Sequence, residues 1–189
     1  MRRVRALLFD LDGTLIDSAE ANYSAYARAL HEVGAIVEPS EVARRAAGRQ
    51  WREFLPELLA LAGVEREPGE VARRKGEIYR DMIGELRVNG PLLALAASVR
   101  PIMKTVLVTT ASADNVGAIL EHFGLGEAFD FVVTGDDVSQ HKPDPEAYRL
   151  ALARLELDPA DCVAFEDSDV GVASATAAGI AVVRVEFGR

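Results

Sequence analysis

An apolar run at the start of the chain ends in two closely spaced aspartates, and this arrangement predicts how the chain begins to fold. Val4 to Phe9 is apolar with one exception, and the sequence Asp-Leu-Asp-Gly-Thr follows directly. Such a run is typical of a short buried strand, so Asp10 lies at its carboxyl end and Asp12 lies in the loop beyond. Gly13 allows a sharp turn and a close approach of the backbone to a ligand.

The two aspartates point to a cation. Carboxylates this close repel each other unless a cation or a shared proton relieves the repulsion, and Mg²⁺ prefers oxygen ligands. The alternative is a turn with two solvated carboxylates, since Asp and Gly are common in turns. The later motifs decide between these interpretations.

Four further strand-like segments follow, separated by single helical segments, and this alternation is the signature of a parallel α/β sheet. More than 90 residues separate the first strand from the second. This is far longer than an ordinary crossover, so an inserted subdomain is expected there. The four segments are Thr105–Thr109, Phe131–Thr134, Cys162–Phe165 and Ile180–Val185.

The inserted segment, residues 18–88, is predicted to be helical throughout, with no strand. Caps, prolines and apolar faces place four helices in it, and Asn89-Gly90-Pro91 marks its end. The helices are expected at Ala19–Val33, at Pro39–Ala47, around Phe54–Leu61 and from Pro68 onward.

Three more segments place reactive side chains at the ends of predicted strands or in the loop before a helix. They are Thr110-Ala111-Ser112, Lys142-Pro143-Asp144-Pro145 and Glu166-Asp167-Ser168. Each segment also has an interpretation without a functional role: helix caps for the first and last, and a solvated loop lysine for the second. Open α/β sheets bind ligands outside the carboxyl ends of their strands, which favours a common site for all three.

Taken together, these four segments resemble motifs I to IV of the haloacid dehalogenase-like hydrolases, in the expected order and over nearly the whole chain. The pattern is most similar to the phosphoglycolate phosphatase and β-phosphoglucomutase subgroup, which carries a helical cap. The resemblance implies a Rossmann-like parallel sheet of order 3-2-1-4-5. It also implies a core domain of residues 1–17 and 89–189 and a cap subdomain of residues 18–88.

The resemblance also implies a role for each motif residue. Asp10 is the nucleophile and a Mg²⁺ ligand. Asp12 is the general acid/base and gives its backbone carbonyl to the metal, and its presence favours phosphate chemistry over dehalogenation. Asp167 completes the metal site, with Glu166 acting through water. The phosphoryl group is held by Thr110 and Lys142, with Ala111 and Ser112 as further substrate contacts.

Substrate choice is expected to depend on the inserted segment. Gly48-Arg49 falls where related caps carry a specificity loop, so Arg49 is either a ligand for an anionic leaving group or a solvated arginine. The roles of Trp51 and His141 are left open. Sugar-phosphate mutases of the family carry a histidine ten residues after the general acid/base, whereas this chain has Asn22.

Composition narrows the class of protein further. Cys162 is the only cysteine, and the net charge is −9 without a long basic run. These features argue against an internal disulfide and against a nucleic-acid surface. The apolar runs are too short to cross a bilayer, and no signal-peptide pattern follows the N-terminus, so a cytoplasmic protein is expected. Its oligomeric state, monomer or homodimer, is left open.

The sequence thus predicts a Mg²⁺-dependent phosphatase that hydrolyses a small phosphorylated metabolite through an aspartyl-phosphate intermediate. Three alternatives remain open: a sugar phosphomutase, a haloacid dehalogenase, and a non-catalytic binding protein on the same fold. The identity of the phosphate ester is not predicted.

Overall fold

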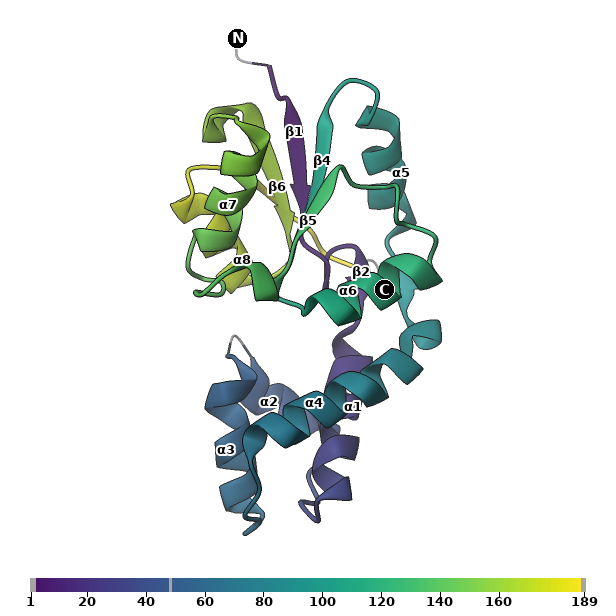
Figure 1. Ribbon diagram of the computed structural model, residues 1–189, viewed down its shortest axis with the longest axis vertical. Coiled ribbons are helices and arrows are strands. Elements are labelled where there is room, and N and C mark those ends of the chain that lie inside the picture. Colours follow the sequence, from purple (N-terminus) through teal and green to yellow (C-terminus); the bar gives the residue numbers. More distant parts are fainter. Residues whose placement is uncertain (1–2, 48, 188–189) are drawn as a thin grey trace. The chain divides into compact units, whose positions relative to one another are not determined.

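The computed structural model describes residues 3–47 and 49–187, and it separates into two compact units (Figure 1). Residues up to Asp17 and from Arg87 onward form one unit, called the core unit below. Ser18–Leu86 forms the other, called the helical unit. Among the described residues, no helix has both the length and the apolar character that crossing a membrane requires.

The core unit is built on a five-stranded parallel sheet of order β5-β4-β1-β6-β7. In chain order this is 3-2-1-4-5, so the predicted fold class and strand order are confirmed. The central position of β1 puts Phe9 between Leu107 of one neighbour and Phe165 of the other. The strands are β1 (Ala6–Phe9), β4 (Lys104–Val108), β5 (Phe131–Val133), β6 (Cys162–Glu166) and β7 (Ala181–Arg184).

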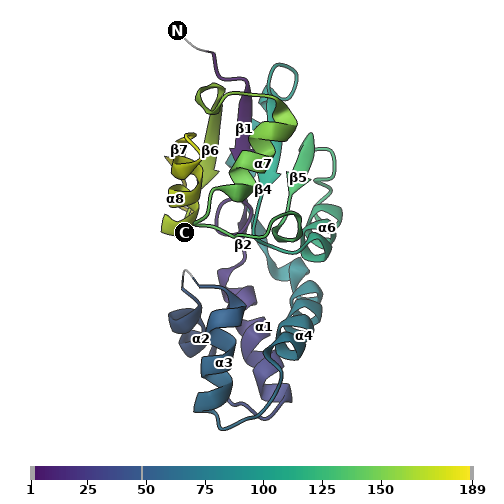
Figure 2. The same ribbon diagram turned by 60° about the vertical axis from the view of Figure 1, so that its left-hand side comes forward.

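Both faces of the central strand are covered, which explains why its sequence is apolar without alternation. Ala6 and Leu8 point to the face covered by α7 (Glu146–Leu155) and α8 (Asp169–Ala177). Phe9 points to the opposite face, where its ring stacks on Phe165 with 4.9 Å between centroids. The core unit also contains helices α5 (Gly90–Val99), labelled in Figure 1, and α6 (Ala113–His122), labelled in Figure 2.

A two-stranded ribbon that the sequence did not predict lies where the chain leaves and re-enters the core unit. β2 (Ile16–Asp17) pairs antiparallel with β3 (Arg87–Val88), and the Arg87 guanidinium forms an ion pair with Asp17. The prediction that residues 18–88 contain no strand was therefore wrong at its last two residues. Two residues are too few to show a period-2 pattern, so their pairing depends on the partner strand.

The helical unit is held together by an apolar interior between four helices. Tyr26 meets Phe54 edge-to-face at 5.2 Å between ring centroids, and Leu30, Leu55 and Leu58 of the same unit are fully buried. The role of this unit as a cap over the site stays a prediction. Its helices are α1 (Ala19–Glu32), α2 (Pro39–Ala46), α3 (Trp51–Leu61) and α4 (Pro68–Asp81), followed by a short 3₁₀ turn, Ile83–Glu85.

Candidate active site

Asp10 follows the last residue of β1, at the carboxyl edge of the sheet. Its backbone N–H donates to the Phe165 carbonyl at 3.0 Å, which joins the end of β1 to β6. Asp10 as a whole residue is only 7% exposed. A buried carboxylate requires a compensating charge or hydrogen bonds, so its neighbours determine what it can do.

Lys142 supplies that charge and joins the ends of three strands. Its Nζ donates to Asp10 Oδ1 at 2.7 Å, to Glu166 Oε1 at 2.6 Å and to the Val108 carbonyl at 3.0 Å. Burial alone would lower the pKa of Lys142, but the charges of Asp10 and Glu166 outweigh burial and raise it above its ordinary value. The side chain therefore remains a fixed ammonium next to Asp10.

Three carboxylates meet at this edge of the sheet. Asp10, Glu166 and Asp167 each offer an oxygen, and the three oxygens lie within 4.8 Å of one another. Burial, reinforced by the charge of Asp10, raises the pKa of Glu166 to about 7 and that of Asp167 to about 6. The raised pKa values show that burial and mutual repulsion disfavour the negative charges of these carboxylates, so binding of a cation between them would be favourable.

The donor set fits a hard divalent cation such as Mg²⁺, which binds carboxylate oxygens and water. Glu166 Oε2 is buried and accepts no hydrogen bond within the described part of the chain, as expected of an oxygen facing a cation or its bound water. The predicted ligands were Asp10, Asp167 and the Asp12 carbonyl, with Glu166 behind water. The structure brings Glu166 as close as the other two carboxylates.

Two glycines leave the space that these acids occupy. A Cβ at Gly13, where φ is +83°, would lie 2.0 Å from Asp167 Oδ2. A Cβ at Gly171 would lie 1.9 Å from Glu166 Oε2. Any side chain at either position would displace a carboxylate. Sequence reasoning found Gly13 from its motif. It missed Gly171, which lies in the first turn of α8 and belongs to none of the recognised motif positions.

The loop after β1 is a tight turn that presents Asp12. The Gly13 N–H donates to the Ile16 carbonyl at 2.7 Å, and the N–H groups of Leu15 and Ile16 both donate to the Leu11 carbonyl at 2.9 Å. The Asp12 side chain is exposed. An exposed carboxyl two residues from a buried one suits proton exchange with a substrate or water, and the role of Asp12 as acid/base stays a prediction.

The turn after β4 carries the predicted phosphate contacts. Its conformation is stabilised by the side chain of Thr109, a role that sequence reasoning missed. Thr109 Oγ1 accepts a hydrogen bond from the Ala111 N–H at 3.1 Å, while the Thr110 side chain is exposed. Ser112 occupies the N-cap position of α6 without a capping hydrogen bond from its side chain. The next N–H, that of Ala113, donates to Asp136 Oδ2 at 2.8 Å, so this helix start already has an acidic partner.

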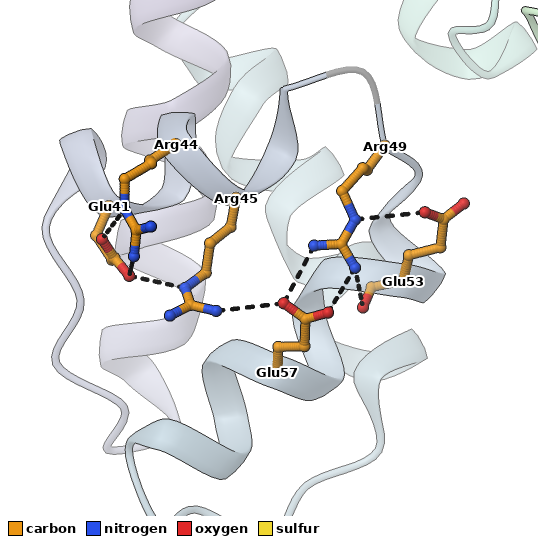
Figure 3. Close-up of polar contacts among 6 residues, drawn as sticks. All are labelled: Glu41, Arg44, Arg45, Arg49, Glu53 and Glu57. Atoms are coloured by element: carbon orange, nitrogen blue, oxygen red, sulfur yellow. Dashed lines mark hydrogen bonds and ion pairs between the residues drawn. The ribbon is translucent and has the colours of Figure 1, made fainter.

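Arg49, the predicted anion ligand, belongs to a network of ion pairs within the helical unit (Figure 3). Its guanidinium donates to both oxygens of Glu57, at 2.5 and 3.1 Å, and to Glu53 at 3.4 Å. Arg45 also donates to Glu57, at 3.2 Å. An anionic leaving group would therefore compete with Glu57 for Arg49. Gly48, the other residue of the predicted loop, lies outside the described residues.

The raised pKa values of Glu166 and Asp167 predict how pH changes the stabilisation by Mg²⁺. Because both folded-state pKa values exceed the ordinary ones, the metal-free fold holds these protons more tightly than the unfolded chain does. The resulting stability is lost as pH rises through about 6 to 7. A cation replaces the protons, so the rise in Tm caused by MgCl₂ should be larger at pH 8 than at pH 5.5.

Differential scanning calorimetry in EDTA and in MgCl₂ at the two pH values measures this effect. The matched variant Asp167→Asn removes one of the two titrating groups and should give a smaller, flatter Mg²⁺ response. An equal rise in Tm at both pH values for the unmodified protein would contradict the cation site.

Comparison with known proteins identifies the family to which this chain belongs. A family model described as haloacid dehalogenase-like hydrolase matches residues 4–179. The fructose-1-phosphate phosphatase YqaB of Escherichia coli (strain K12) is 31% identical over 185 residues, covering 98% of each chain. The validoxylamine A 7'-phosphate phosphatase of Streptomyces hygroscopicus subsp. limoneus is 34% identical over 179 residues, covering 93% of this chain and 83% of that protein.

Among solved structures, CbbY from Rhodobacter sphaeroides in complex with phosphate matches with a TM-score of 0.85 at 27% identity. The match covers 98% of this chain and 87% of that one. The family model and the relatives cover nearly all of the present chain. The chain belongs to the haloacid dehalogenase-like hydrolases, in the group that contains β-phosphoglucomutases, phosphoglycolate phosphatases and CbbY proteins.

Proposed function

We propose that the protein is a Mg²⁺-dependent phosphatase that hydrolyses a small phosphorylated sugar or a similar metabolite. The observation that carries this proposal is the buried contact of Asp10 with the Lys142 ammonium, beside the carboxylates of Glu166 and Asp167. The names of the related proteins support phosphate monoesters of sugar-like molecules as the substrate class.

Asp10 is the nucleophile in this proposal. One of its carboxylate oxygens attacks phosphorus while the bond between phosphorus and the ester oxygen breaks, which leaves an aspartyl phosphate. Asp12 gives its proton to the departing alkoxide. It then takes a proton from the water that attacks the aspartyl phosphate, so that phosphate leaves and the Asp10 carboxylate is restored.

The groups around Asp10 would offset the negative charge of the phosphoryl group. Lys142 keeps an ammonium beside Asp10 and offsets the charge of the phosphoryl oxygens, and the exposed Thr110 hydroxyl would hold one of those oxygens. Asp10, Glu166 and Asp167 would hold the cation, which supplies further positive charge to the transferring group. The negative net charge of the chain makes these local cations necessary for an anionic substrate.

The test is a screen of phosphate esters with the purified protein, MgCl₂ and detection of inorganic phosphate. The panel includes fructose 1-phosphate, other sugar phosphates and phosphoglycolate, with EDTA as the control. We expect metal-dependent release from at least one sugar phosphate. A protein that binds Mg²⁺ but releases phosphate from no member of the panel would contradict the proposal.

A second arm of the screen distinguishes hydrolysis from phosphoryl transfer between sugar positions. A mutase must hold its aspartyl phosphate away from water, and the mutase histidine is Asn22 here, which cannot exchange a proton with Asp12. Incubation with β-glucose 1-phosphate and a trace of glucose 1,6-bisphosphate should therefore yield phosphate. Faster formation of glucose 6-phosphate than of phosphate would identify a mutase instead.

A further inference from the structure

The buried phenol of Tyr148 contacts Glu166 of the candidate active site, a contact that was not recognised from the sequence. Tyr148, in the first turn of α7, is fully buried. Its O–H donates to Glu166 Oε1 at 2.5 Å, and its ring centroid lies 5.2 Å from Lys142 Nζ. Burial, together with the charge of Glu166, raises the pKa of Tyr148 well above its ordinary value. The phenol therefore keeps its proton and remains a donor.

The hydrogen bonds of Lys142 explain why this donor matters. An ammonium has three N–H groups, and those of Lys142 are all in use, on Asp10, Glu166 and the Val108 carbonyl. If Lys142 is to hold a phosphoryl oxygen, one of these three contacts must be released. A buried carboxylate oxygen that loses its only donor raises the free energy of the complex, so the choice of contact affects phosphate affinity.

Glu166 Oε1 is the acceptor that can lose Lys142 and remain hydrogen-bonded, because Tyr148 donates to the same oxygen atom. Release of Asp10 would instead remove the counter-charge from the nucleophile. We propose that Tyr148 is a positioning residue: its O–H keeps Glu166 hydrogen-bonded while Lys142 transfers an N–H from Glu166 to the phosphoryl group. This inference rests on the proposed phosphatase function, in which Lys142 binds that group.

The variant Tyr148→Phe tests the role of the hydroxyl, since the phenyl ring keeps its packing and its contact with Lys142. Without the second donor, Lys142 remains tied to Glu166, and inorganic phosphate should bind about tenfold more weakly at saturating Mg²⁺, a factor that corresponds to about 1.4 kcal/mol. KM for a phosphate ester should rise by a similar factor with a smaller change in kcat, and Mg²⁺ should bind the phosphate-free variant within about twofold of the unmodified affinity.

Isothermal titration calorimetry with Mg²⁺, and with phosphate in the presence of Mg²⁺, separates the possible outcomes. The matched control is Tyr26→Phe, which removes a buried phenol oxygen in the helical unit and should leave both affinities unchanged. Unchanged phosphate affinity in Tyr148→Phe would overturn the proposal. Equal losses of Mg²⁺ and phosphate affinity would also overturn it, because the phenol would then act only on the cation site.

A crystal structure of the unmodified protein with Mg²⁺ and phosphate tests the same idea without a substitution. We expect Lys142 Nζ to contact a phosphate oxygen and Asp10 but no longer Glu166, which stays hydrogen-bonded to Tyr148. A Lys142 that keeps Glu166 and leaves the Val108 carbonyl would refute the transfer. Phosphate binding can be measured even if the protein hydrolyses no ester, so failure of the proposed function and failure of this inference are distinguishable.

Discussion

Replacement of Asp10 by Asn is expected to lower kcat for any phosphate ester substrate by at least about three orders of magnitude. The amide is a poor nucleophile and a weaker ligand for a divalent cation than the carboxylate. Its oxygen can still accept the hydrogen bond that Lys142 now donates to Asp10 Oδ1, so the variant should fold. Single-turnover measurements of phosphate release at saturating Mg²⁺, with Tm recorded in parallel, give the result.

Asp169→Asn is the matched control for this substitution. Asp169 is also an acidic residue near a strand end, but its side chain is 90% exposed and pairs with Arg184 on the surface. Its loss should change kcat less than about twofold, since exposed ion pairs contribute little. If Asp10→Asn and Asp169→Asn turned over substrate at similar rates, Asp10 would not be the nucleophile.

Lys142→Met should strongly destabilise the core unit. The Lys142 and Glu166 side chains are 4% and 1% exposed, and that of Asp10 is 9% exposed. Removal of the ammonium leaves two buried carboxylates without their counter-charge, which typically costs about 3–5 kcal/mol. Hydrolysis should also fall by about two to three orders of magnitude, because the phosphoryl oxygens lose a fixed cation.

The pH dependence of this loss has a definite sign. The Lys142 ammonium lowers the pKa of Glu166, so its loss raises that pKa further. The folded variant then binds a proton that the unfolded chain releases. The variant should therefore be closest to the unmodified protein near pH 5 and should lose stability as pH increases. Urea unfolding at pH 5.5 and pH 8 measures the difference.

Lys104→Met provides the comparison. Lys104 lies at the other end of β4, is 60% exposed and pairs with Asp130 at 2.7 Å. Because this pair is exposed, its loss should cost less than about 1 kcal/mol. Equal stability of the two variants, or a loss in Lys142→Met that does not depend on pH, would show that Lys142 does not neutralise the carboxylates.

The strands were predictable because each carries its own signal, whereas their order in the sheet was implied by the family resemblance. Five short apolar segments recur along the chain, the last four separated by single helices. The reactive residues stand where the strands end, as Asp10 and Asp167 do. Strand ends of a parallel sheet share one edge, so the clustering of these side chains follows from topology. The central sheet and the acidic cluster could therefore be predicted from local patterns and one resemblance.

What the sequence did not reveal depends on contacts between distant elements. Tyr148 has the apolar surroundings of an ordinary core residue of α7, and only the packing of α7 on the sheet brings its O–H to Glu166. Gly171 matters because a carboxylate lies over it. Ser112 and Ser168 both precede helices, yet only Ser168 accepts the capping hydrogen bond, from the Gly171 N–H.

The ribbon formed by Ile16–Asp17 and Arg87–Val88 bears on how much the length of the segment between its two strands can change. Because these strands pair, with the Asn89 N–H also donating to the Leu15 carbonyl at 2.8 Å, the chain leaves and re-enters the core unit at neighbouring points, as in a hairpin with a very long tip. The entropy of closing such a tip grows only with the logarithm of its length. We therefore expect this chain to tolerate a longer or shorter insert at the hairpin while every strand of the five-stranded sheet keeps its register.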